Sequence, residues 1–531
     1  RKEGKSHALV DVIATMFGVR FDVLWQRHER RRKKIRNIWI AITSVFLLCV
    51  LGFYDYNRTK VEYYADFVDR WGVAEGIIPL DDDQVSHRHH SYKFEYTRVP
   101  FGEKDFYSWR LKRVSLVNSK GVISNYTPDH HAFFYPIQEF EYTDGYVTDI
   151  INRDTYKRIV MRYSVKDDYG HNVACLIDME GKEKRQGSAY LDASTTSMTP
   201  NINSNSTKSK IKRFHYTRNE RGYIMKITYH ANDGDDIEET AIGDNNNIFG
   251  KLFDLDSLGR VIKVSYINNE NNLMTDKFGV GHIRYTYSKY SGTEATEFLG
   301  EDLQLTNNEE KYAKVNSKFD KYGNIIEESY YGLDNMPCYN NENVHRLIIS
   351  YDNSGNMSEI RLYDLNGSLS YCKDSYAILK SSYDSKGRCV EFAFYDINEK
   401  ACYSKDNYSI ARIKYNSTDC AIEQSVFDTN GLPCVEKYYG VHKICRNYNE
   451  YNYLLEESLY DEFDELNVSP MYHFAKQTYE YNDYHQLISI KNFNEFGVPC
   501  NHKNNYSEQC LTYDKRGNIE NLSFCDAYGN H

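Results

Sequence analysis

Two kinds of apolar pattern divide the chain. From Ile38 to Tyr54, seventeen consecutive residues carry no charge. At about 1.5 Å each they reach roughly 26 Å as a helix, the short end of what spans a bilayer. Beyond them, apolar and polar residues alternate in short runs, as in HRLIISY (345–351) and NMSEIRLY (356–363), which is typical of half-buried strands. The pattern predicts a single N-terminal transmembrane helix followed by a mainly β region.

The strands recur at a fixed period. A first aromatic residue returns every 32 or 33 residues, and a second usually follows twelve residues later. A constant period of this size indicates a repeat architecture. We therefore predict an elongated or curled array of about 32-residue β-hairpin repeats. Each unit is expected to hold two strands joined by a tight turn, plus a loop of about a dozen residues with a third short extended piece. The first aromatics are Tyr287, Phe319, Tyr351, Tyr383, Tyr415, Tyr448, Tyr481 and Tyr513.

Turn chemistry explains the phrase Tyr-Asp-x-x-Gly within these repeats. Asp at the first position and Gly at the fourth suit a type I turn closed by a left-handed residue. Where Gly is replaced in the first turn, the substitutes include Asp419, Asn452 and His485, types that tolerate positive φ; in the second turn Glu399 is the exception. We assign turn formation and sheet packing, not catalysis, to Tyr351, Asp352, Gly355, Tyr363, Asp364, Gly367, Tyr383, Asp384 and Gly387.

A basic block precedes the apolar run. Seven Lys or Arg residues lie between Arg27 and Arg36, and those that flank the predicted span 38–54 most closely are Arg30, Arg31, Arg32, Lys33, Lys34 and Arg36. The positive-inside rule then places 1–36 in the cytoplasm and the chain from about residue 55 outside the cell membrane. A buried core helix and a signal peptide are the alternatives for the apolar run.

Cysteine usage fits this topology poorly. Cys49 lies in the predicted span, so 11 of the 12 cysteines remain outside, and an odd number cannot all pair within one chain. Four of them, Cys338, Cys402, Cys434 and Cys500, recur with the repeat, which we interpret as one small, soft apolar position rather than a disulfide ladder or metal row.

Two family resemblances add expectations. The phrase RKEG, the stretch SHALVDVIATMFGV and the Arg-rich run resemble the tail that follows Toll/interleukin-1 receptor (TIR) domains in bacterial membrane-anchored proteins. This implies a TIR core, with NAD cleavage in some members, upstream of residue 1, and assigns no site residue here; a generic basic juxtamembrane helix is the alternative. Residues 211–531 resemble the YD repeats of bacterial Rhs-type proteins, which implies a curled β-sheet that encloses a toxin or presents an adhesive surface.

The predicted organisation follows. It comprises cytoplasmic juxtamembrane helices (1–36), a transmembrane helix (37–55), a β-rich membrane-proximal region with possible degenerate repeats (56–192), a polar linker (193–210) and the repeat domain (211–531). Both ends are expected to be cut from a longer protein. The cluster His87, His89 and His90, with Asp129, His130 and His131 elsewhere, is interpreted as solvent-facing rather than a metal site.

The predicted function is binding, not catalysis. No motif for a catalytic site, cofactor or metal stands out, and a net charge of -11 opposes nucleic-acid binding. We predict a single-pass membrane sensor whose outer repeats bind a protein or glycan ligand. It would be coupled to an upstream effector, through which the chain could oligomerise. The alternative is a Rhs-like toxin shell or surface adhesin.

Overall fold

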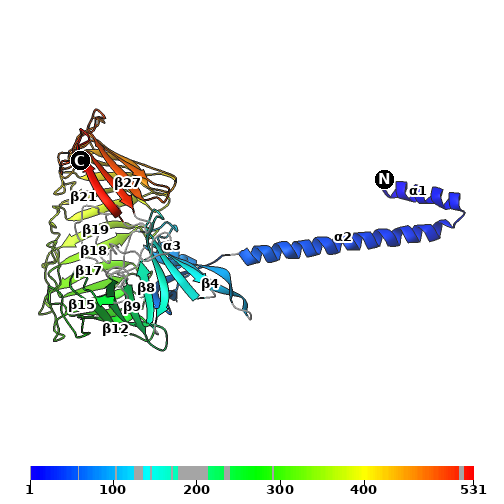
Figure 1. Ribbon diagram of the computed structural model, residues 1–531, viewed down its shortest axis with the longest axis horizontal. Coiled ribbons are helices and arrows are strands. Elements are labelled where there is room, and N and C mark those ends of the chain that lie inside the picture. Colours follow the sequence, from blue (N-terminus) through cyan, green and yellow to red (C-terminus); the bar gives the residue numbers. More distant parts are fainter. Residues whose placement is uncertain are drawn as a thin grey trace.

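The computed structural model describes residues 2–57, 59–101, 105–124, 136–143, 146–168, 171–176, 213–232, 239–244, 246–289, 292–513 and 519–530. Two helices form the N-terminal part, α1 (Lys2–Phe17) and α2 (Phe21–Asn57). Gly18, at φ 60°, ends α1 in the left-handed conformation that suits glycine, and Asp22 lies in the first turn of α2 near its positive dipole end. The two helices project from a large β region (Figure 1).

Helix α2 joins the basic block to the predicted membrane span without a break. Within the described residues it is the one helix long and apolar enough to cross a membrane, judged by length and composition. Its apolar side chains are exposed; Leu48 is 67% and Phe46 69% accessible. A soluble packing partner for this face is absent from the described part of the chain, because α2 contacts mainly α1.

One antiparallel sheet contains all the described strands, and nearly every strand pairs with its sequence neighbours. A short helix, α3 (Asp82–His87), lies between β2 and β3. The strands between α2 and residue 192 are β1 (Lys60–Arg70), β2 (Val73–Pro79), β3 (Ser91–Phe101), β4 (Asp105–Val117), β5 (Ile137–Thr143), β6 (Tyr146–Arg153), β7 (Ile159–Asp168) and β8 (His171–Leu176). The predicted linker 193–210 lies outside the described residues.

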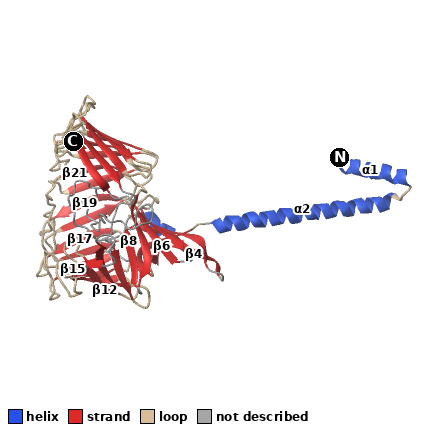
Figure 2. Cartoon of the chain, in the orientation of Figure 1, coloured by secondary structure: helices blue, strands red, loops and turns tan. Residues whose placement is uncertain are grey.

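The sheet continues without interruption into the repeats (Figure 2). Its remaining strands are β9 (Arg213–Arg218), β10 (Ile224–Asn232), β11 (Glu239–Ala241), β12 (Gly250–Leu255), β13 (Val261–Ile267), β14 (His282–Tyr287), β15 (Thr293–Leu299), β16 (Lys314–Phe319), β17 (Ile325–Tyr331), β18 (Arg346–Tyr351), β19 (Met357–Tyr363), β20 (Ile378–Tyr383), β21 (Cys389–Tyr395), β22 (Ile410–Tyr415), β23 (Ala421–Phe427), β24 (Lys443–Tyr448), β25 (Leu454–Tyr460), β26 (Lys476–Tyr481), β27 (Leu487–Phe493), β28 (Glu508–Tyr513) and β29 (Ile519–Cys525). The mainly β hairpin array with an N-terminal apolar helix is therefore confirmed.

Strand register gives the repeats two unlike faces. In the β18–β19 hairpin, Leu347 pairs with Leu362 and Ile349 with Ile360, so these apolar side chains share one face. The opposite face carries ion pairs such as Arg361 with Glu359. Alternation of this kind is why six- or seven-residue strands could be read from the sequence.

Most repeats contain three turns of one kind, where two had been predicted; in two repeats the third turn is one residue longer, closed by Gly440 N–H to Glu436 and His473 N–H to Ser469. In the first turn the N–H of Gly355 donates to the carbonyl of Asp352 (3.1 Å), and in the second Gly367 does so to Asp364 (3.2 Å). The third turn lies in the predicted loop, where Ser375, at φ 69°, donates to Cys372 (3.0 Å). Third turns of neighbouring repeats also bond to each other, for example Lys405 N–H to the carbonyl of Asp374 (2.9 Å). This left-handed position is Ser375 here but Gly279, Lys311 or Asn343 in other repeats, so no single residue type marked the turn in the sequence.

Candidate functional site

The aspartates of the repeats are occupied by their own turns. Asp352 Oδ1 accepts hydrogen bonds from the N–H groups of Ser354 (2.8 Å) and Asn356 (2.9 Å), and Asp364 Oδ1 has the equivalent pair of bonds within its turn. Gly355, Gly367 and Gly387 all have positive φ, at 72°, 80° and 73°. These carboxylates therefore bind backbone N–H groups, a structural use that leaves little of them for chemistry.

At the first turn of the next repeat, Arg388 provides a further hydrogen bond to the turn aspartate, Asp384. Its Nε donates to Asp384 Oδ2 at 2.7 Å. Burial alone would raise the pKa of Asp384, but the bonds from Arg388 and the backbone outweigh it and lower the pKa below its ordinary value. The carboxylate thus stays charged and fixed.

Tyrosine hydroxyls connect neighbouring repeats. Tyr351 Oη donates to the carbonyl of Ile325 (2.7 Å), and Tyr383 Oη donates to that of Met357 (2.7 Å). The acceptor is each time the first residue of the second strand in the preceding repeat. We call this series the hydroxyl ladder; its other donors are Tyr287, Tyr415, Tyr448, Tyr481 and Tyr513. Sequence reasoning assigned only packing to these rings, although the use of Tyr over Phe at seven of eight positions was an available signal.

Cysteines lie in a second row of inter-repeat contacts. The thiol of Cys402 lies 3.9 Å from the carbonyl of Ser375, and that of Cys500 lies 3.4 Å from the carbonyl of His473. Burial raises the pKa of Cys402 to about 11, so the thiol stays protonated at neutral pH. The four cysteines that recur with the repeat, Cys338, Cys402, Cys434 and Cys500, form no disulfide.

The basic residues flanking the predicted span lie along α2. The side chains of Arg30, Arg31, Arg32, Lys33, Lys34 and Arg36 are all exposed, and Lys33 lies 3.8 Å from Glu29 across one helical turn. The helix thus presents a ring of positive charge directly before its apolar part.

The N-terminal strands dock on the first turns of the repeats. Asn324 joins the two parts twice, because its Nδ2 donates to the carbonyl of His87 (2.8 Å) and its Oδ1 accepts from the N–H of His89 (2.7 Å). Arg88, 4% exposed, donates to the carbonyl of Tyr322. Burial lowers the pKa of Arg88 to about 10, against the raising effect of nearby acidic groups.

Further contacts continue along successive repeats. Asn118 Nδ2 donates to the carbonyls of Lys386 and Gly387, both at 3.1 Å, and Asn452 Nδ2 donates to that of Tyr156 (3.1 Å). We call these contacts, from residues 87–89, 118–119 and 156 to the first turns, the seam. Residues separated by more than 200 positions meet here, so the sheet curls back on its own N-terminal strands.

The seam corrects the interpretation of the histidine cluster. His87 stacks on Tyr322, with ring centroids 4.5 Å apart, and burial lowers the pKa of His89. These side chains pack against the repeats instead of facing solvent. Within the described residues no group of three or more potential metal ligands forms; Asp129, His130 and His131 lie outside them.

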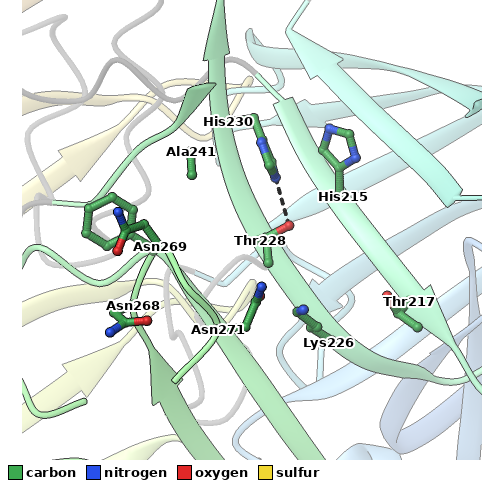
Figure 3. A pocket seen from close by; sticks show the side chains of 10 residues that line it. His215, Thr217, Lys226, Thr228, His230, Ala241, Asn268, Asn269 and Asn271 are labelled. Carbon is green, nitrogen blue, oxygen red and sulfur yellow. Dashed lines mark hydrogen bonds between the residues drawn. The ribbon is translucent and has the colours of Figure 1, made fainter. Parts of the chain in front are cut away.

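A polar pocket of about 230 Å³ lies where β9 and β10 meet the turn after β13 (Figure 3). His215 and His230 approach with ring centroids 4.1 Å apart, and Thr228 Oγ1 lies 2.8 Å from His230 Nε2. Lys226 and the side chains of Asn268 and Asn271 complete the polar lining. No motif in the sequence pointed to it, because the residues come from three separate segments.

An exposed apolar ridge follows the second turns. Each of eight repeats places one large apolar side chain there, with exposed fractions from 42% to 89%; the residues are Leu303, Leu333, Leu365, Ile397, Leu432, Phe463, Phe496 and Tyr528. We call this row the second-turn ridge. It lies at the opposite strand ends from the seam, because first and second turns close opposite ends of each hairpin.

The same eight turns are strongly acidic. Thirteen carboxylates accompany a single basic residue, Lys400; they are Glu301, Asp302, Asp334, Asp364, Asp396, Glu399, Asp428, Asp461, Glu462, Asp464, Glu465, Glu495 and Asp526. Glu399, at φ 61°, is bound by Arg361 (2.8 Å), and Asp464 by Lys443. The ridge therefore combines apolar side chains with negative charge.

No protein family model and no curated protein matches the sequence. Among solved structures, TcdB2-TccC3-TEV is 10% identical with a TM-score of 0.28 and covers 80% of this chain, and the match spans 22% of that chain. A Tc holotoxin pore from Photorhabdus luminescens is 11% identical, with a TM-score of 0.23, over 83% of this chain and 25% of its own. A porin-like protein from Bacteroides uniformis is 10% identical, with a TM-score of 0.14, over 68% of this chain and 95% of its own. The chain thus spans about a quarter or less of the two toxin chains that it matches.

Proposed function

We propose that this chain is a membrane-tethered binding protein whose hairpin array is the recognition part. Helix α2 is the anchor, the array lies outside the cytoplasm, and a TIR-like effector, as the N-terminal resemblance implies, acts on the cytoplasmic side. The observation that carries the proposal is the second-turn ridge, a row of exposed apolar side chains at one end of the hairpins. Rows of this kind mark interaction surfaces more often than chance exposure.

The anchor is supported by the exposed apolar face of α2 and the basic ring beside it. Cationic residues stay on the cytoplasmic side, since translocating them across the membrane is unfavourable. This arrangement supports an extracytoplasmic location for the array.

Protease protection in spheroplasts tests this topology. External protease should degrade the array while leaving an N-terminal epitope intact. Charge reversal at Arg30, Arg31 and Arg32 to Glu should invert a measurable fraction of the molecules, whereas Lys2→Glu, outside the basic ring, should not. An array that resists protease in spheroplasts but not in lysed cells would place it in the cytoplasm and refute the proposal.

The seam favours a second candidate, a shell that encloses another polypeptide. A sheet that curls back and bonds to its own N-terminal strands can surround a volume. The test is the purified chain: a shell should carry a co-purifying, protease-resistant polypeptide, whereas a binding array should run at 62.4 kDa alone.

A further inference from the structure

The C-terminal part of the second-turn ridge carries its largest exposed side chains. Phe463, Phe496 and Tyr528 are 77%, 80% and 89% exposed and occupy the same, third position of three successive turns. An aromatic ring held in water at equivalent positions of consecutive repeats gains nothing from folding of the array itself. Aromatic side chains of this kind are the usual anchors of protein interfaces.

The negative charge beside these aromatic residues indicates a positively charged partner. The turn around Phe463 has the sequence DEFDE, with four carboxylates, and Glu495 precedes Phe496. Among the described residues, Glu462, Glu465 and Glu495 take part in no ion pair, so their charge is not cancelled locally. A surface like this repels anionic lipid and nucleic acid and attracts cations.

The distance between neighbouring ridge residues indicates the secondary structure of the partner. Each repeat adds two strands, so neighbouring ridge residues are about 10 Å apart at roughly 4.8 Å per strand. Two turns of an α-helix, seven residues, advance about 10.5 Å. A helix with apolar residues at heptad spacing therefore meets one ridge residue every two turns. In an extended strand, about 10 Å corresponds to three residues, and side chains three positions apart point to opposite faces. A strand therefore cannot place an apolar side chain on each ridge residue.

Sheet twist limits the length of the contact. At roughly 20–25° per strand, the ridge turns by about 40–50° per repeat. A straight helix can follow about three repeats before it leaves the ridge, which corresponds to roughly 21 residues.

From these observations we infer that Phe463, Phe496 and Tyr528, with the carboxylates beside them, bind a basic amphipathic α-helix of about three heptads on a partner protein. This inference rests on the proposed function, in which the array is the recognition part. It names the class of partner and the place where that partner binds.

Binding of a synthetic helix tests the inference. The full chain is placed in nanodiscs of zwitterionic phosphatidylcholine, and the probe is a fluorescein-labelled 21-residue peptide with Leu at the heptad core positions and Lys elsewhere. Fluorescence anisotropy should report saturable binding above that to empty discs. The double variant Phe463→Ser/Phe496→Ser should weaken it at least tenfold, and Glu462→Gln/Glu465→Gln should weaken it and flatten its salt dependence.

Matched controls make the result specific. Leu333→Ser changes another ridge residue, 57% exposed, three or more repeats away, and should alter binding less than twofold. A peptide with the same residues scrambled out of heptad order, or with Glu in place of Lys, should bind at least tenfold more weakly. Equal binding by the scrambled peptide, or by the Phe463→Ser/Phe496→Ser chain, would overturn the inference. Because insertion into the nanodisc is measured separately by co-purification, such a failure leaves the membrane anchor untouched, whereas failure to insert would contradict the proposed function itself.

Discussion

Tyr383→Phe isolates one rung of the hydroxyl ladder. The change removes only the oxygen that donates to the Met357 carbonyl at 2.7 Å. Phe319 occupies the equivalent place in another repeat, so the site accepts a phenylalanine ring without repacking. The effect should therefore be that of a hydrogen bond alone.

The size of the stability change depends on the hydrogen bond that the Met357 carbonyl loses. A net protein hydrogen bond contributes about 1 kcal/mol, and an acceptor left unsatisfied in a part-buried site can cost about 1–3 kcal/mol. We expect Tyr383→Phe to lower the free energy of unfolding by about 1–2 kcal/mol. A second change at Tyr448, two repeats away and roughly 20 Å along the array, should add its own contribution nearly independently.

Hydrogen exchange is the appropriate assay, because repeat arrays open locally as well as globally. Amides of β19 and β20 should exchange roughly five- to thirtyfold faster in Tyr383→Phe, the factor that corresponds to about 1–2 kcal/mol. Tyr371→Phe, a tyrosine 44% exposed at the third turn, is the matched control and should change little. If both variants exchange alike, the hydroxyl ladder does not stabilise the array.

Three further predictions concern the seam and the ladder. Gly355→Ala should lower the free energy of unfolding in urea by about 2–5 kcal/mol, because a Cβ there would lie 2.6 Å from the Arg88 backbone. The control Gly431→Ala, at similar φ but with open space around it, should cost only about 1–2 kcal/mol. Equal costs would contradict the seam. Asn324→Ala removes two seam bonds and should make the N-terminal strands markedly more susceptible to limited proteolysis, and unchanged cleavage would count against the docking. Burial raises the pKa of Tyr415 to about 12 from an ordinary 10.0. The stability that its protonated hydroxyl contributes is therefore complete below about pH 10 and is lost as the pH rises through about 12. Absorbance at about 295 nm should show a late tyrosine titration that coincides with unfolding, and a single midpoint near pH 10 would refute the prediction.

Prediction from sequence succeeded where a pattern repeats locally. The 32-residue period, the two strands and the left-handed turn residues all follow from alternation and turn chemistry within one unit. Glu399 looked like an exception, yet it adopts the same positive φ, with Arg361 bound to its carboxylate. The backbone geometry is thus set by the array, and the residue conforms to it.

What could not be predicted depends on contacts between distant segments. Asn324 and His87 are 237 residues apart, and nothing near either residue indicates that they bond. The third turn was missed because residues as different as Gly279, Lys311 and Ser375 occupy its left-handed position in different repeats. The pocket between His215 and His230 depends on strand register, which the sequence leaves open at this irregular end of the array.

Because the hairpins are stacked, the array can lengthen greatly when its repeats unfold. One repeat of 32 residues occupies about 10 Å along the stack but can extend to roughly 105–115 Å once unravelled. A pull on the far end of the array acts along the stacking direction, so hairpins separate one after another rather than together. Each lost repeat lengthens the connection by about 100 Å and relieves the tension on those still folded. For a chain tethered through α2, as proposed, a partner held at the ridge would thus move far from the tether without being released.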